Sequence, residues 1–109
     1  MIDAEAIVVL MTAASFEEAE RIAEMLVNQK LAACVQVLPE MQSIYFWQDK
    51  VQRDREVLMI AKTVRANFAA LEQKVRAMHS YETPEIIALP IVAGSERYLE
   101  WLATSCEAS

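Results

Sequence analysis

Short apolar runs alternate with amphipathic stretches along this chain, and their order predicts the fold. Residues 6–11 form a β-branched apolar run, which is typical of a strand buried on both faces. From residue 16 to about 30, apolar side chains recur at helical spacing. Ser15 and Glu18 form a capping box at the start of this stretch, and Glu17 adds a charge that suits the helix dipole. A strand followed by an amphipathic helix is therefore expected.

The middle of the chain predicts a long hairpin. Residues 32–38 indicate a second strand, which Pro39 should break or bulge because proline has no amide proton for the ladder. Pairing is expected to resume over residues 43–47. After a turn at residues 48–50, the chain should return as a third strand over residues 51–62.

The last third of the chain predicts a helix, a strand and one more helix. The helix should run from about residue 65 to 79 and the strand from 85 to 91, and a terminal helix should begin at residues 94–95. Apolar residues mark the inward faces of these helices: Phe68, Leu71, Val75 and Met78, then Tyr98, Trp101 and Leu102. The order indicates a single α+β domain spanning residues 1–109. Its expected fold is a ferredoxin-like βαββαβ sandwich with an extra C-terminal helix, in which two helices cover one face of a four-stranded antiparallel sheet.

The central hairpin is longer than the domain that would carry it. Residues 32–47 would extend about 50 Å at ~3.3 Å per residue, whereas a compact chain of this length has a diameter of roughly 35 Å. The far end carries Tyr45, Phe46 and Trp47. An aromatic ribbon with unpaired edges favours contact with another subunit. The alternative is a hairpin that curls back onto its own sheet, and spacing alone does not count subunits.

Composition and charge narrow the functional classes. The net charge of −6 argues against a nucleic-acid partner, because phosphate contacts need clustered Lys and Arg. A single glycine cannot supply a phosphate-binding loop, and no window approaches the ~20 apolar residues of a membrane span. The two cysteines form no CxxC motif and no secretory signal precedes them. The expected location is therefore the cytoplasm, with reduced thiols.

Few side chains suggest chemistry by themselves. His79 is the only histidine and should end a helix, where the dipole favours its protonated form; a purely structural role is the alternative. Cys34, Met11 and Met78 are by default packing residues, although thiolates and thioethers suit Cu(I). No catalytic dyad, triad or metal signature such as HExxH can be justified from spacing, so the chain is not expected to be an enzyme.

Several segments spread over nearly the whole chain resemble the CutA family of divalent-cation tolerance proteins. The matching segments are 31–35 (LAACV), 43–47 (SIYFW), Glu56, 62–63 (KT), 79–81 (HSY), 83–86 (TPEI), 89–91 (LPI) and 98–101 (YLEW). The resemblance implies a homotrimer with the architecture of the PII signalling proteins, in which the long hairpin pairs strands across subunits. It also implies a role in the response to divalent metal ions, with copper binding.

The resemblance implies two sets of site residues. The cleft between subunits would contain polar and aromatic residues: Tyr45, Trp47, Glu56, Lys62, His79, Tyr81 and Glu85. The metal positions, a cysteine and two histidines in a bacterial relative, read Met11, Met78 and His79 here, and Cys34 is a further sulfur candidate. Two thioethers and one imidazole suit Cu(I) better than Cu(II) or Zn(II). Ser80 and Asp49 also depart from the family, which has proline and glycine at these positions.

Three functional classes remain open from the sequence. The first is a homotrimer that binds copper or another divalent cation and contributes to metal tolerance. The second is a PII-like sensor that binds a small anionic ligand at Lys62 in the cleft. The third is a structural trimer in which Glu56, Lys62, His79 and Glu85 only pair with one another. No organic cofactor, nucleic acid or membrane is expected as a partner.

Overall fold

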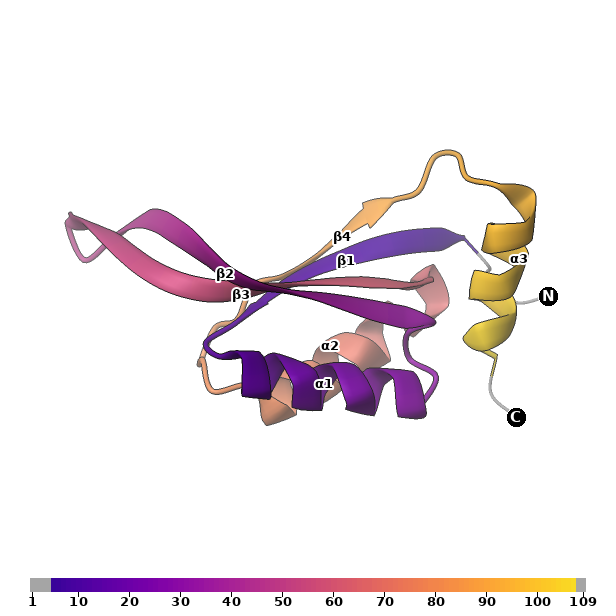
Figure 1. The fold of residues 1–109 in the computed structure, drawn as a ribbon, viewed down its shortest axis with the longest axis horizontal. Helices are drawn as coiled ribbons and strands as arrows, with labels where there is room; N and C mark the ends of the chain where they lie inside the picture. Colours follow the sequence, from indigo (N-terminus) through magenta and orange to yellow (C-terminus); the bar gives the residue numbers. More distant parts are fainter. Residues whose placement is uncertain (1–4, 108–109) are drawn as a thin grey trace.

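The computed structural model describes residues 5–107 and confirms the ferredoxin-like α+β fold (Figure 1). Its strands are β1 (Ala6–Ala13), β2 (Cys34–Trp47), β3 (Lys50–Val64) and β4 (Ile86–Pro90). Its helices are α1 (Phe16–Asn28), α2 (Phe68–Met78), which follows a short 3-10 turn η1 (Arg65–Asn67), and α3 (Glu96–Ser105). The sheet is antiparallel with the order β2-β3-β1-β4. Helices α1 and α2 lie on one face, and α3 lies at the end opposite the hairpin.

Helix α1 begins and ends with well-formed caps. The Ser15 Oγ accepts the Glu18 N–H at 3.1 Å, as the capping box predicts. The C-terminus is a Schellman motif, which ends the helix at Asn28, two residues earlier than expected. Lys30 takes the left-handed position of this motif with φ 60°, and its N–H bonds to the Val27 carbonyl. The helix thereby leads directly into the turn before β2.

Strand β1 is buried on one face only, so the prediction of a strand buried on both faces is wrong for this chain. Its helix-facing side is fully covered and consists of Ile7, Val9, Met11 and Ala13. Val8 and Leu10 point to the opposite side and are half-buried. On the edge strand β4, Ile87 and Leu89 pair with them and are exposed. The face of the sheet without helices is therefore apolar and open.

The β2–β3 hairpin extends past the helices, as Figure 1 shows at the left of the view. The molecule measures 47 Å along its longest axis, which confirms the overhang and rules out a hairpin curled back on its own sheet. A bulge between Leu38 and Met41 occurs where Pro39 predicted an interruption, but the strand continues through it. At the tip, Gln48 and Asp49 both have positive φ, which is the type I′ turn that suits a two-residue hairpin loop.

The inward faces of α2 and α3 are narrower than the apolar spacing predicted. Met78 in α2 is exposed, whereas the α2 core contacts come from Leu71 and Val75. In α3 only Leu102 is fully buried, in a small second core beside Val64 and Cys106. Tyr98 and Trp101 are 42% and 47% exposed, so their prediction as inward-facing is wrong. Their rings contact each other at 5.5 Å between centroids instead.

Within residues 5–107, no helix is long and apolar enough to cross a membrane.

Candidate functional site

The seven residues expected in a cleft fall into separate groups along the long axis. They are Tyr45 and Trp47 on the overhang, Glu56, His79 and Tyr81 at the hairpin base, Lys62 toward α3, and Glu85 just before β4. Glu56 and Lys62 are six positions apart on β3, which is roughly 20 Å at ~3.3 Å per residue. One chain therefore does not bring the set together. Any cleft containing all of them needs more than one subunit.

Both ring nitrogens of His79 are engaged in hydrogen bonds. The Tyr81 N–H donates to Nδ1 at 3.0 Å, and Nε2 lies 2.6 Å from the Thr12 carbonyl oxygen. Because Nδ1 accepts, the neutral ring carries its proton on Nε2 and donates it to Thr12. In this tautomer no nitrogen lone pair points toward solvent. His79 would have to break one of these bonds to bind a metal ion.

Tyr81 connects the α2–β4 turn to the base of the hairpin. Its hydroxyl donates to Glu56 Oε2 at 3.2 Å, and its ring lies 4.8 Å from the His79 ring. Burial, together with the negative charge of Glu56, raises the pKa of Tyr81 to about 12. The phenol therefore stays protonated at neutral pH and holds the Glu56 carboxylate through a donated hydrogen bond.

A second phenol and carboxylate pair lies on the overhang. The Tyr45 hydroxyl donates to Asp54 Oδ2, and this hydrogen bond raises the pKa of Tyr45. Asp54 and Glu56 are two residues apart on β3, so their side chains lie on the same face of the hairpin at roughly 7 Å spacing. This face continues the open face of the sheet. The chain thus presents two carboxylates on one face of the hairpin.

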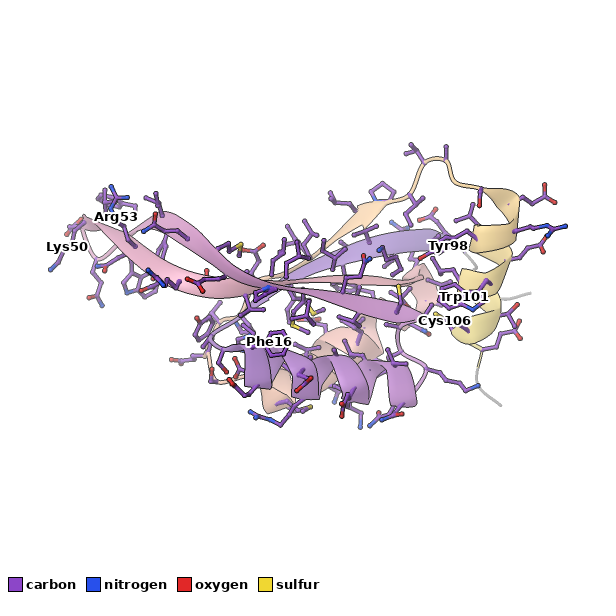
Figure 2. The ribbon with its side chains drawn as sticks, in the orientation of Figure 1. Phe16, Lys50, Arg53, Tyr98, Trp101 and Cys106 are labelled. Carbon is purple, nitrogen blue, oxygen red and sulfur yellow. The ribbon has the colours of Figure 1, made fainter. Side chains whose placement is uncertain are left out.

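Lys62 lies near the other end of the sheet. Its ammonium donates to Gln36 Oε1, and it sits opposite Cys34 on β2. The Cys34 thiol is 3.7 Å from the Tyr98 hydroxyl of α3. In the part of the chain that the structure describes, the ion pairs involve only arginines, so no carboxylate lies within 4 Å of the Lys62 ammonium. Figure 2 shows α3 and its Tyr98 far from Lys50 and Arg53 at the hairpin tip.

The sulfur candidates do not surround His79. Met11 precedes Thr12 in sequence, but its side chain is fully buried on the helix-facing side of β1, opposite Met59. Met78 is exposed at the end of α2, and Cys34 belongs to the distant Lys62 region. Over residues 5–107, no three His, Cys, Asp or Glu side chains are arranged to hold a metal ion.

Glu18 is a site residue that the sequence indicated only as a helix cap. Its side chain is buried, with 5% exposed. Oε1 accepts the Ala14 N–H at 3.0 Å and Oε2 accepts the Ser80 N–H at 2.8 Å. Burial alone would raise the pKa of Glu18, but these hydrogen bonds and the nearby His79 outweigh it and lower the pKa. No spacing signal links positions 18 and 80, because their contact depends on the packing of α1 beside α2.

A groove of about 250 Å³ lies at the hairpin base, between the β1–α1 turn and the β2 bulge. Phe16 and Pro39 give it an apolar wall, and Figure 2 places Phe16 at the start of α1 beneath the departing hairpin. Glu56 and the ion pair between Arg55 and Glu40, at 2.6 Å, form the polar wall. The Glu56–Tyr81 contact therefore borders a solvent-accessible hollow.

Comparison with known proteins gives consistent matches. The model of the family described as "CutA1 divalent ion tolerance protein" matches residues 7–105. "Divalent-cation tolerance protein CutA" of Thermus thermophilus is 48% identical over 87% of this chain and 92% of its own length. "Protein CutA 1, chloroplastic" of Oryza sativa subsp. japonica is 46% identical over 94% of this chain, which spans only 58% of that protein. A crystal structure of CutA1 from Oryza sativa superposes with a TM-score of 0.92 at 45% identity, covering 96% of both chains.

Proposed function

Because this chain belongs to the CutA1 divalent ion tolerance family, we propose that it is a homotrimeric, cytoplasmic protein that binds a divalent cation and contributes to cation tolerance. The names of its relatives support the role in tolerance. The main support for cation binding is the pair of carboxylates, Asp54 and Glu56, on one face of β3. The resemblance supports three as the number of subunits, and the protein acts by binding rather than by catalysis.

The hairpin supports the assembly. Phe46, Trp47 and Val51 are 67%, 61% and 59% exposed and gather at its tip, and a contiguous exposed apolar patch is typical of an interaction surface. The strands β2 and β4 are the two edges of the sheet and offer unpaired backbone groups. A neighbouring subunit covers the aromatic side chains and completes these edges at the same time.

The cation site is shared between subunits. Asp54 and Glu56 supply oxygen ligands, which suit hard divalent cations, but two carboxylates are fewer than such ions require. The remaining donors come from a neighbouring chain. Copper is the cation that the resemblance implies. Here it would bind at the carboxylates more readily than at Met11 and His79, since Met11 is buried and the His79 ring is fully bonded.

Native mass spectrometry of the untagged chain tests this proposal, with Cu²⁺, Zn²⁺ or Mg²⁺ added in turn. We expect a trimer that retains at least one of these cations. The double variant Asp54→Asn with Glu56→Gln should form the trimer without the cation. The matched control is Glu40→Gln, which removes a nearby carboxylate that is already paired with Arg55. A monomer at micromolar concentration, or equal cation retention by the double variant, would contradict the proposal.

One observation favours a second function, the binding of a small anion. The Lys62 ammonium has a neutral amide as its partner, sits among apolar side chains on the open face, and has no carboxylate within 4 Å among the described residues. An anionic ligand would supply the missing counter-charge. Inorganic phosphate and ATP are suitable probes, and binding should raise the melting temperature of the wild type but not of Lys62→Met. Equal melting temperatures with and without both probes would argue against this function.

A further inference from the structure

The buried carboxylate of Glu18 joins two parts of the chain that are 62 positions apart. One oxygen accepts the Ala14 N–H at the start of α1, and the other accepts the Ser80 N–H in the α2–β4 turn. The residues on either side of Ser80 make the contacts of the candidate site. His79 bonds to the Thr12 carbonyl, and Tyr81 bonds to Glu56. The only link from the middle of this turn to α1 among the hydrogen bonds described is therefore the Glu18 carboxylate.

We propose that Glu18 is a positioning residue for the cation site: it fixes the turn at residues 79–81 against α1 so that the Tyr81 hydroxyl meets the Glu56 carboxylate. This inference rests on the proposed cation site at Glu56. Glu18 lies in α1, beneath the sheet, and does not touch the cation. It acts through Ser80 and Tyr81, and it sets where one of the carboxylate ligands is held.

Helix capping alone does not account for Glu18. The Ser15 hydroxyl already caps α1 by accepting the Glu18 N–H. Glu17 is exposed in the same helical turn and offers the same favourable interaction with the helix dipole. Burying a carboxylate is unfavourable unless hydrogen bonds compensate it, and here the second oxygen is satisfied only by the distant Ser80. The buried position is therefore tied to the turn rather than to the helix.

The first test compares Glu18→Gln with Glu17→Gln in the full chain. Glutamine keeps the shape of Glu18 but has one acceptor oxygen, so it cannot serve both N–H groups. Amide hydrogen exchange at Ser80 should rise about tenfold or more in Glu18→Gln, since a hydrogen bond to a charged acceptor is lost. The affinity for the retained cation should fall about tenfold, as is typical when a residue supporting a metal ligand is removed. Glu17→Gln should change neither.

The second test removes the donor instead of the acceptor. Ser80→Pro deletes both the Ser80 N–H and the Ser80 hydroxyl, which each bond to the Glu18 carboxylate. His79 already has the extended backbone, φ −77° and ψ 142°, that a following proline requires. This variant should weaken cation binding as Glu18→Gln does and shift the NMR signals of the Tyr81 ring. Combining both substitutions should add no further loss, because they break the same contact.

The outcomes separate this inference from the proposed function. If Ser80 exchange rises in Glu18→Gln while cation affinity stays at the wild-type value, Glu18 only stabilises the turn and the inference is wrong. Unchanged Ser80 exchange also overturns it. If the wild type binds none of the three cations, the proposed function fails, and the Tyr81 signals decide the inference. A shift in Glu18→Gln but not in Glu17→Gln supports the positioning of Tyr81, and no shift refutes it.

Discussion

Strands β2 and β3 belong to two different regions: the body, where helices α1 and α2 cover the sheet, and the hairpin that extends past these helices. The two regions differ in whether their apolar side chains are covered. Along β3, Val57, Met59 and Ala61 face the helices and are buried. Beyond the bulge the hairpin continues to alternate, but Phe46 and its cross-strand partner Val51 have no helix beneath them. Apolar side chains that continue along a hairpin beyond the helices that cover the sheet are typical of a surface that contacts another chain. The helix-covered part of the sheet buries its apolar side chains within the chain, whereas the hairpin does not, which is why we propose that a neighbouring subunit covers it.

The largest effect should come from breaking the body. Leu26 is fully buried between α1 and the sheet. Leu26→Ala removes packed methyl groups and leaves a cavity, so we expect a loss of about 2–5 kcal/mol in the free energy of unfolding. Urea denaturation followed by circular dichroism measures it. The control is Val27→Ala, an exposed neighbour that should change stability by less than about 1 kcal/mol. Equal losses would mean that α1 packs differently.

The next effect tests the hairpin. Phe46→Ser and Trp47→Ser remove exposed aromatic side chains, so secondary structure should persist while association weakens by about 2 kcal/mol or more per residue. Sedimentation velocity over a range of concentrations measures the change. Val27→Ser is the matched control, since it removes an exposed apolar side chain from the helix layer instead. The comparison between body and hairpin fails if the tip variants unfold the chain without changing its association.

The third effect tests the junction between the two regions, at Glu18. Its pKa is lowered in the folded chain, so the carboxylate adds stability above its unfolded pKa, near 4.5, and this contribution is lost as the pH falls below that value. Glu18→Gln should therefore lose about 1.5–3 kcal/mol at neutral pH and show a shallower decline in acid. Urea titrations at several pH values measure both. Glu17→Gln should lose less, about 0.3–1 kcal/mol, because it gives up only an exposed interaction with the helix dipole. A wild-type slope in Glu18→Gln would contradict this account.

The sequence predicts the body well because its signals are local and periodic. Alternation, capping at Ser15 and the missing amide of Pro39 placed the strands, the first helix and the bulge. The same periodicity cannot tell how wide a covered helix face is. Tyr98 and Trp101 fit the spacing of a buried face, yet α3 touches only the end of the sheet and buries little more than Leu102.

The candidate site is less predictable because its contacts are long-range. The Glu18–Ser80 bond depends on how α1 lies beside α2. The separation of Glu56 and Lys62, by contrast, could be read from the sequence, because six positions along the predicted third strand already place them roughly 20 Å apart. His79 Nε2 is hydrogen-bonded because the backbone of β1 places the Thr12 carbonyl oxygen next to it. Such features need coordinates rather than patterns.

The smallest effect on stability should come from relieving backbone strain at two residues with positive φ, one at the end of α1 and one at the hairpin tip. Lys30 occupies the left-handed position of the α1 C-terminus, where the Leu31 N–H reaches the Leu26 carbonyl at 2.9 Å. Lys30→Gly relieves the Cβ clash and should stabilise the chain by about 0.5–1 kcal/mol, after allowing for the greater freedom of glycine when unfolded. Lys30→Ala keeps the strain and serves as the control. Asp49→Gly at the hairpin tip should gain less, because aspartate tolerates this conformation better than lysine. Thermal unfolding measures all three, and a larger gain at Asp49 than at Lys30 would mean that turn strain in the overhang limits the stability of the whole chain.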